Sequence, residues 1–420
     1  MALQSDKKLF TNFLSLGLVQ FTNFALPLLT YPYLFRTVGK SYFGAITYAF
    51  SLMVYLSALT DYGFNISAPR TVALVQNDRI KLSKIVSIVY QTKIYIFLAC
   101  NLLLILGLLT IDRLQEDLWL YGLGTLYLAG TCVLPTWLYQ GLEDMRHITW
   151  INLLAKVVST LLIFILIKKP EDYQYTVGLF GVANLLSGLI GVFYACRRYK
   201  LTLNWQPTSI IIKELKDGFY HFSSSLSSVA FSNSTVFILG LFVSNAIIGS
   251  YGIVEKIIFA LWQLISIFSQ VTYPVICRLA VDSHKLVLEF MRKYYVLFTA
   301  VIALGCLLVA FFANEIIYVV TGHYQSDTVT LLRILSIFPF IVCLNVSAYQ
   351  LLLVYEKQKV NALIFNVSVL LNAIACTVLS SIYGAIGAAY SAIFTQIAVT
   401  LSLHWVLATR FPNHSLWAHR

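Results

Sequence analysis

The sequence predicts an all-α polytopic membrane protein, and three features lead to this fold class. Hydrophobic residues make up 59% of the 420 positions, and charged residues only 11%. A soluble domain usually carries about 25% charged residues, so this chain has too few to cover a water-facing surface. Apolar runs of roughly 20 residues, the length that crosses a bilayer, recur along the whole sequence. The runs lack strand alternation, so we expect helices, which satisfy their own backbone groups in lipid.

About twelve transmembrane helices are expected. The first apolar run is too long for a signal-peptide core and no small-residue cleavage site follows it, so we expect it to be retained. In chain order, the predicted spans are 9–35, 42–61, 85–109, 117–139, 147–167, 175–196, 219–243, 247–277, 293–320, 328–354, 359–381 and 386–409.

Lysine and arginine set the expected orientation. With the N-terminus inside, 20 of the 29 basic residues fall in cytoplasmic segments or at the first, cytoplasmic residue of a span (Lys293 and Lys359), five in outward loops and four deeper inside spans. This excess on one side follows the positive-inside rule. We therefore expect both termini in the cytoplasm, and we attribute the net charge of +11 to topology, with no role in binding nucleic acid.

The second half of the chain repeats features of the first. YQGLEDMRH, which begins at Tyr139, resembles YQLLLVYEKQK, which begins at Tyr349, and in each an acid precedes a base by three residues. GKSYFGAITYAF at the start of span two similarly resembles IIGSYGIVEKIIFAL at span eight. Internal repeats of this kind are typical of transporters. We predict two pseudo-symmetric six-helix lobes, residues 1–212 and 213–420, with a substrate path between them.

No sequence pattern indicates catalysis or a bound cofactor. The expected outward loops are too short for a soluble domain, and the chain has no nucleophile–base arrangement, phosphate-binding glycine loop or metal motif. The seven cysteines and seven histidines show no metal-ligand spacing. We therefore expect a transporter that has no enzyme activity, no cofactor and no metal.

Several stretches are similar to a known family. PLLTYPYLFRTVGKSYFGAITYAF at 27–50 and LTDYGFNISAPRTVALVQND at 59–78 closely resemble the N-terminal half of bacterial oligosaccharide repeat-unit flippases. These proteins form the polysaccharide-biosynthesis branch of the multidrug/oligosaccharidyl-lipid/polysaccharide exporter superfamily. WLYQGLEDMRHITWINLLAKVV and YGIVEKIIFALWQLISIFSQVTYPVI look like the same family, so the resemblance extends along the chain.

The resemblance implies two six-helix lobes around a central cavity, and a cargo of oligosaccharide repeat units linked to undecaprenyl pyrophosphate. Such a flippase moves its cargo from the cytoplasmic to the periplasmic leaflet of the bacterial inner membrane by alternating access, for O-antigen, lipopolysaccharide or capsule assembly. Expected partners are this lipid-linked cargo, the bilayer, a coupling proton or cation, and the polymerase of the same pathway. Peptidoglycan-precursor flippases of the superfamily carry arginines in the first helix. This chain has no arginine before Arg36, which disfavours that cargo.

Ionisable side chains inside spans are candidate functional residues, because a charge at the centre of a membrane helix costs at least about 2.5–3.5 kcal/mol. Lys93, Lys156 and Lys256 each lie about nine residues into a span, near the bilayer centre. Their charge suits an anionic pyrophosphate, so we predict that they bind substrate; structural pairing with an acid is the alternative. Glu255, the one acid deep in a predicted span, is the predicted site of proton or cation coupling. Consecutive residues point about 100° apart on a helix, so we expect Glu255 and Lys256 to face different spots.

The stretch after span two supplies two further candidates. Asp61 closes this span at its cytoplasmic end, and Gly63 and Pro69 shape the backbone before Arg70. We predict that Asp61 is a gating residue paired with Arg70 at the inner mouth of the cavity, where Arg70 would bind the anionic head group. The alternative is a loop that only sets the topology.

Two other functions compete with a flippase. A drug or cation antiporter of the same superfamily needs acids in its cavity, whereas this chain has three deep lysines and one deep acid. A membrane-bound glycan polymerase or ligase is expected to have a large outward loop, and the predicted topology has none.

Overall fold

The computed structural model describes residues 25–410, and every regular element in this range is helical. Nine helices among these residues are long and apolar enough to cross a membrane. The all-α polytopic fold class is therefore confirmed, while the count of about twelve spans stays a prediction. Residues 9–24 of the first predicted span and both chain ends lie outside the described residues.

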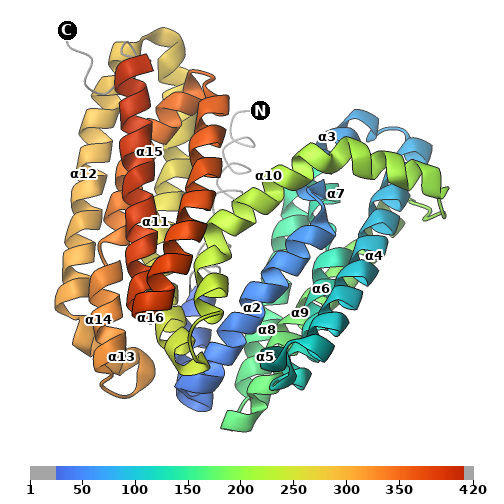
Figure 1. Cartoon of the computed structure of the whole chain (residues 1–420). Helices are drawn as coiled ribbons and strands as arrows, with labels where there is room; N and C mark the ends of the chain where they lie inside the picture. The colour runs from blue at the N-terminus through green and yellow to red at the C-terminus, as the bar shows by residue number, and fades with distance from the viewer. Residues whose placement is uncertain (1–24, 411–420) are drawn as a thin grey trace, which may run out of the picture. The chain divides into compact units, whose positions relative to one another are not determined.

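The chain divides into two compact units, and the boundary falls between Ala230 and Phe231. This boundary lies inside α10 (Thr208–Gly240), a continuous helix that belongs to both units. Figure 1 shows the first unit in blue to green and the second in yellow-green to red. The predicted lobes, 1–212 and 213–420, describe an internal duplication and stay a prediction.

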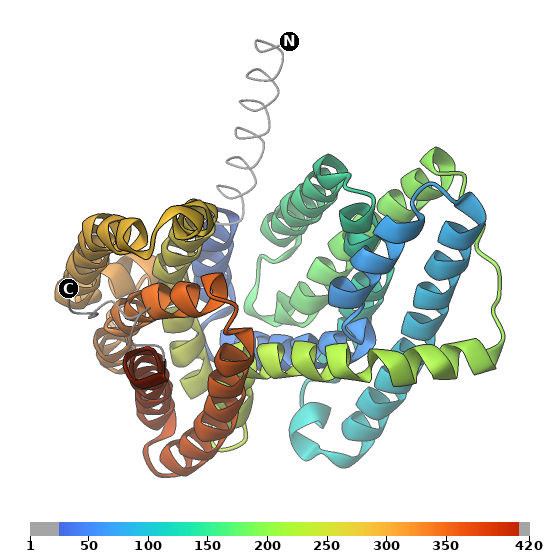
Figure 2. The same cartoon turned by 90° about the horizontal axis from the view of Figure 1, so that it is seen from above.

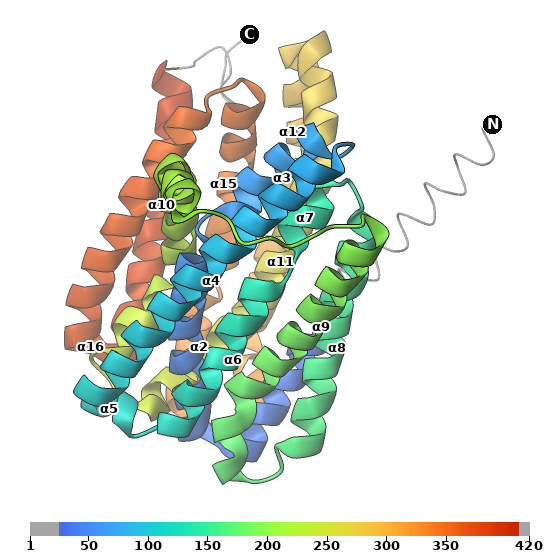
Figure 3. The ribbon, with the colours of Figure 1, turned by 90° about the vertical axis from the view of Figure 1, so that its right-hand side faces the viewer.

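Unit 1 is a bundle in which close helix contacts depend on glycine. Figures 1 and 3 show α6 and α9 side by side. A Cβ added at Gly181 of α9 would lie 2.3 Å from the backbone nitrogen of Tyr127 on α6, so only glycine allows this approach. After a helical stretch at 25–38, the elements are α2 (Lys40–Asp61), α3 (Phe64–Val75), α4 (Arg79–Thr110), α5 (Asp112–Gln115), α6 (Leu118–Val133), α7 (Thr136–Gly141), α8 (Met145–Leu166), the 3-10 helix η1 (Pro170–Tyr175), α9 (Thr176–Arg198) and the first part of α10.

Unit 2 has a core formed where α11, α12, α15 and α16 meet, and Figure 2 shows its helices end-on. Within this core the Tyr295 hydroxyl donates to Gln350 and is 2.8 Å from Thr272, so buried polar groups on three helices satisfy one another. The elements after α10 are α11 (Asn245–Asp282), α12 (His284–Phe311), α13 (Ala313–Thr321), α14 (Ser326–Leu335), α15 (Phe338–Val354) and α16 (Gln358–Arg410).

A proline and a glycine interrupt two of the long helical stretches. Pro135 separates α6 from α7 within predicted span 117–139, because proline cannot donate the next helical hydrogen bond. Gly384 has φ 57° and ψ −132°, which divides α16 into two parts that match predicted spans 359–381 and 386–409. The stretch after Asp61 was expected to be a loop, but it contains helix α3. That expectation was wrong.

Two turns at corresponding places in the two units have the same backbone geometry. Glu143 follows α7 and Glu356 follows α15, and their φ angles are 57° and 59°. In both turns the next residue donates a backbone hydrogen bond to the carbonyl five residues earlier. Glycine is usual at this left-handed position, and another residue costs about 1 kcal/mol there. The shared geometry supports the predicted duplication.

Candidate functional site

The candidate site in unit 1 is built on a sharp elbow between α2 and α3. Tyr62 and Gly63 are both left-handed, with φ of 48° and 75°, and they reverse the chain within two residues. A Cβ at Gly63 would lie 2.6 Å from the carbonyl carbon of His221 in the first half of α10. Glycine is therefore required for both the angle and the space. The elbow fixes the position of Asp61, the last residue of α2.

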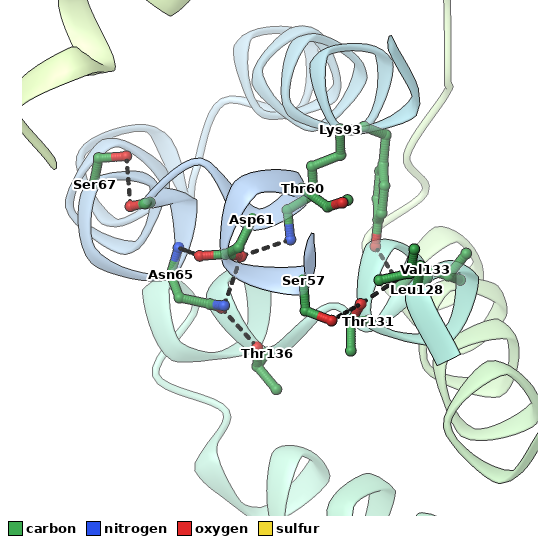
Figure 4. A network of polar contacts seen from close by, with 12 residues as sticks. Ser57, Thr60, Asp61, Asn65, Ser67, Lys93, Leu128, Thr131, Val133 and Thr136 are labelled. Carbon is green, nitrogen blue, oxygen red and sulfur yellow. Dashed lines mark hydrogen bonds and ion pairs between the residues drawn. The ribbon is translucent and has the colours of Figure 1, made fainter. Parts of the chain in front are cut away.

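Asp61 forms an ion pair with Lys93 near the middle of α4 (Figure 4). The Lys93 Nζ lies 2.9 Å from the Asp61 Oδ1, and the two side chains are 1% and 17% exposed. A buried charge left without a partner would be strongly unfavourable, so each of these residues needs the other. The predicted pairing of Asp61 with Arg70 was wrong: Arg70 is an exposed residue of α3.

The pair extends into a hydrogen-bonded chain through three further contacts, two between side chains and one from a backbone N–H. The Asn65 side chain donates to Asp61 Oδ1 at 2.7 Å, and the Asn65 backbone N–H lies 3.3 Å from Oδ2. Thr136 at the start of α7 donates to Asn65 Oδ1 at 2.8 Å. Figure 4 shows these groups converging from α2, α3, α4 and α7. The Asp61 carboxylate is thus held by both lysine and amide donors.

Exposure differs along this chain of contacts. Asn65 is exposed and Asp61 is partly exposed, whereas Lys93 is covered. Within unit 1 the Asn65 amide and part of the Asp61 carboxylate are thus open to contact, whereas the Lys93 side chain is covered. The substrate-binding role of Lys93 and the gating role of Asp61 stay predictions.

Unit 2 holds a second pair of predicted residues on α11. The Lys256 Nζ lies 3.0 Å from the Glu255 Oε2, and the two side chains are 32% and 31% exposed. We expected consecutive residues to face different spots, and this was wrong because both side chains are long and flexible enough to meet beside the helix. Lys156, the remaining candidate, lies half-buried on α8. Coupling at Glu255 and substrate binding at Lys156, Lys256 and Arg70 stay predictions.

Sequence reasoning missed Asn65 and Thr136. Asn65 follows Asp61 by only four residues, and this closeness in sequence could have indicated the contact, although the elbow at Tyr62 and Gly63 places the two residues on different helices. Thr136 carried no such signal, because its partner lies on an element distant in the sequence.

A further polar cluster joins the α7–α8 turn to the end of α9. The Asp144 carboxylate lies 2.6 Å from His147 Nδ1 and accepts a hydrogen bond from the Tyr199 hydroxyl at 2.8 Å. Burial raises the pKa of Asp144, but hydrogen bonds from His147 and Tyr199 and the charge of Arg198 outweigh it. The pKa therefore lies below its ordinary value of 3.8. Because Asp144 stays ionised at neutral pH, this cluster stabilises the turn.

These features define a class: a multi-pass helical membrane protein with the fold of lipid flippases and multidrug transporters. The fold is similar to that of "Lipid II flippase MurJ, inward closed conformation", with a TM-score of 0.70 and 16% identity over 94% of this chain and 87% of that chain. It is also similar to an inward-facing "multidrug resistance MATE family transporter of the MOP superfamily", with a TM-score of 0.58 and 14% identity over 94% and 95% of the two chains.

The family is shown by the sequence. A family model described as "Polysaccharide biosynthesis protein" matches residues 9–280, and this chain belongs to that family. A relative from Escherichia coli (strain K12), named "Putative O-antigen transporter", is 26% identical over 93% of this chain and 94% of its own length. A relative of the same name from Shigella dysenteriae is 23% identical over 93% of this chain and 98% of its own length. The predicted family resemblance is thus confirmed.

Proposed function

We propose that this protein is a flippase for oligosaccharide repeat units linked to undecaprenyl pyrophosphate. It moves them from the cytoplasmic to the periplasmic leaflet by alternating access, for O-antigen or a related surface polysaccharide. The observation that carries this proposal is the similarity to two O-antigen transporter relatives over 93% of the chain. The fold shared with a lipid II flippase supports a lipid-linked cargo.

The chemistry of the predicted residues fits this cargo. A pyrophosphate is anionic and a glycan offers many hydroxyls, so a binding site needs cations together with hydrogen-bonding groups. Four of the six predicted residues are cations. Asn65 and Thr136 add amide and hydroxyl groups beside Asp61. Chemistry on the cargo is not part of this proposal: the protein is a transporter and not an enzyme.

A drug or cation antiporter is the second candidate, because the fold is also that of a multidrug transporter. A cation-binding site requires an acid that an organic cation can approach. Here both predicted acids contact lysine ammonium groups, Asp61 with Lys93 and Glu255 with Lys256. An organic cation would have to displace these lysines, so the contacts favour the anionic cargo.

The remaining parts of the proposal concern location and energy. We place the protein in the bacterial inner membrane with both termini in the cytoplasm, as the distribution of basic residues indicates. Glu255 is the site of a coupling proton or cation, and the polymerase of the same pathway receives the flipped cargo.

The experiment is restoration of surface polysaccharide in a strain that lacks its own repeat-unit flippase. We expect the wild-type chain to restore polymerised glycan and the Lys156→Ala and Lys256→Ala variants to lose most of it, since each removes a predicted cation for the pyrophosphate. Protein levels should stay near normal. The matched control is Lys81→Ala, which removes an exposed lysine that pairs with Asp78 in the turn before α4.

Full restoration by both lysine variants would reject the cationic binding site. Failure of the wild-type chain, together with resistance to a cationic drug, would favour the antiporter.

A further inference from the structure

The connection between α9 and α10 is extended and follows the first turns of α4, as Figure 3 shows for the green trace between these helices. We call residues 200–207 the strap. Three backbone N–H groups of the strap donate to three side chains of α4. The hydrogen bonds are Thr202 to Ser83 Oγ at 3.2 Å, Asn204 to Ser87 Oγ at 3.0 Å, and Gln206 to Gln91 Oε1 at 2.8 Å.

The hydrogen bonds recur at the same distance along the helix and along the extended strap. The acceptors are four residues apart on α4, a rise of about 6 Å along a helix. The donors are two residues apart, which spans about 6.6 Å in an extended chain. The two repeats therefore stay in register over three contacts, so that every second strap residue meets one turn of α4. A chance contact of a loop with a helix would not produce this pattern.

Other contacts hold both ends of the strap. At its start, the Arg79 side chain donates to the carbonyl of Lys200. At its end, the Gln91 amide also donates to the carbonyl of Gln206 at 3.0 Å, so these two residues bind each other reciprocally. The Trp205 ring meets the Tyr95 ring edge-on at 5.9 Å between centroids. The acceptor side chains on α4 are buried, so losing the strap would leave them without their partners.

The strap leads directly into the first half of α10, which also contacts the elbow. The Tyr62 hydroxyl donates to the carbonyl of Leu215 at 2.8 Å, and the Tyr62 ring stacks on Phe222 at 4.6 Å. Gly63 packs against the backbone of His221. The first half of α10 is thus attached to α4 through the strap and to the Asp61 elbow through Tyr62 and Gly63.

We propose that the strap is a permanent positioning element of unit 1. It holds the first half of α10 against the elbow that carries Asp61, and it remains bound to α4 throughout transport. Gln91, Ser87 and Ser83 act on the site only through α10 and the elbow. The attachment also accounts for the unit boundary, which lies inside α10 after Ala230 and not in the connection that precedes this helix.

The attachment is tested by hydrogen–deuterium exchange on the full chain in lipid nanodiscs. A variant with Ser83→Ala, Ser87→Ala and Gln91→Leu should exchange the amides of residues 202, 204 and 206 at least about tenfold faster than wild type. The matched control is Asn101→Leu, because the Asn101 amide on the same helix donates to the Phe97 carbonyl and not to the strap. Rapid exchange in wild type, or unchanged exchange in the triple variant, would overturn the proposal.

Permanence is tested by cross-linking and rests on the proposed function. Tyr95→Cys with Trp205→Cys is joined by a short thiol-directed reagent, and flipping of a lipid-linked oligosaccharide is measured in proteoliposomes. Each single variant and the wild type, which has seven free cysteines, serve as controls. Flipping should stay within about twofold of the unlinked protein, whereas its loss on cross-linking would show that the strap must detach. If wild type itself fails to flip this cargo, the proposed function fails, and the exchange experiment still decides whether the strap exists.

Discussion

At the residue scale, the ion pair of Asp61 and Lys93 is the contact on which the unit 1 site depends. It joins the end of α2 to the middle of α4, and the lysine is almost fully covered. An ion pair of this kind contributes little over a well-packed apolar pair, but removal of one partner leaves a charge without compensation. The identity of one residue therefore constrains the other.

We predict that Lys93→Ala lowers the free energy of unfolding by about 3 kcal/mol, because the Asp61 carboxylate loses its ammonium partner. The double variant Asp61→Asn with Lys93→Met should recover part of this loss, since no charge remains. Denaturant unfolding in detergent measures both changes. Arg70→Ala, at an exposed position of α3, serves as the control and should change stability little. Strictly additive losses in the double variant would contradict the pairing.

Several candidate residues could be predicted from the sequence, because the free-energy cost of placing a charge in the membrane is enough to identify them. A charge deep in an apolar run is unfavourable, so Lys93, Lys256 and Glu255 could be singled out without a structure. Their partners could not be predicted in this way. The partner of Asp61 depends on how α2 and α4 pack: it is Lys93, although Arg70 is nearer in sequence.

At the element scale, the elbow between α2 and α3 depends on Gly63 for two separate reasons. Its φ of 75° is unfavourable for any other residue, and its Cα approaches the backbone of α10. The sequence indicated a bend here through Gly63 and Pro69. It did not predict that the following residues form a helix, because α3 is short and is kept in place by packing against α4 and α7.

We predict that Gly63→Ala destabilises the protein more than Gly39→Ala does. Both glycines have positive φ, but ψ is 10° at Gly63 and 167° at Gly39, and a Cβ at Gly39 would meet nothing within 4 Å. Gly39→Ala therefore measures the strain of a backbone conformation that only glycine usually adopts, about 1–3 kcal/mol, without a clash. The additional loss in Gly63→Ala measures the clash with His221. Thermal unfolding of the two variants provides the comparison, and equal losses would mean that α10 shifts away without cost.

At the scale of the whole molecule, the proposed cargo brings negative charge across the membrane. Moving one charge through 100 mV is worth about 2.3 kcal/mol, and the cell interior is negative. A pyrophosphate with about two negative charges is therefore driven outward by roughly 4–5 kcal/mol if it crosses without compensation. Lysines that accompany the cargo would reduce this drive, and a returning proton or cation would then be needed to reset the protein.

We predict that flipping in proteoliposomes responds to membrane potential, and that Glu255→Gln weakens its dependence on an ion gradient. The reason is that Glu255 lies within α11 beside Lys256, where a carboxylate can exchange a lysine for a proton or cation. Glu356→Gln, which changes an exposed acid in the turn after α15, is the control. Flipping that ignores both potential and gradients would make Glu255 a structural partner of Lys256.

The strap also bears on how this chain can be cut or tagged. A connection between two lobes is an obvious place to divide a membrane protein or to insert an affinity tag. The reason is that exposed connections usually tolerate insertions. Here the strap, which lies where the two predicted lobes join, is hydrogen-bonded to α4 at every second residue. Inserting an odd number of residues would turn the N–H groups away from the helix, and a break at Asn204 would separate α10 from its anchor. The turn at Glu356, whose side chain is exposed, is the better place for a foreign peptide.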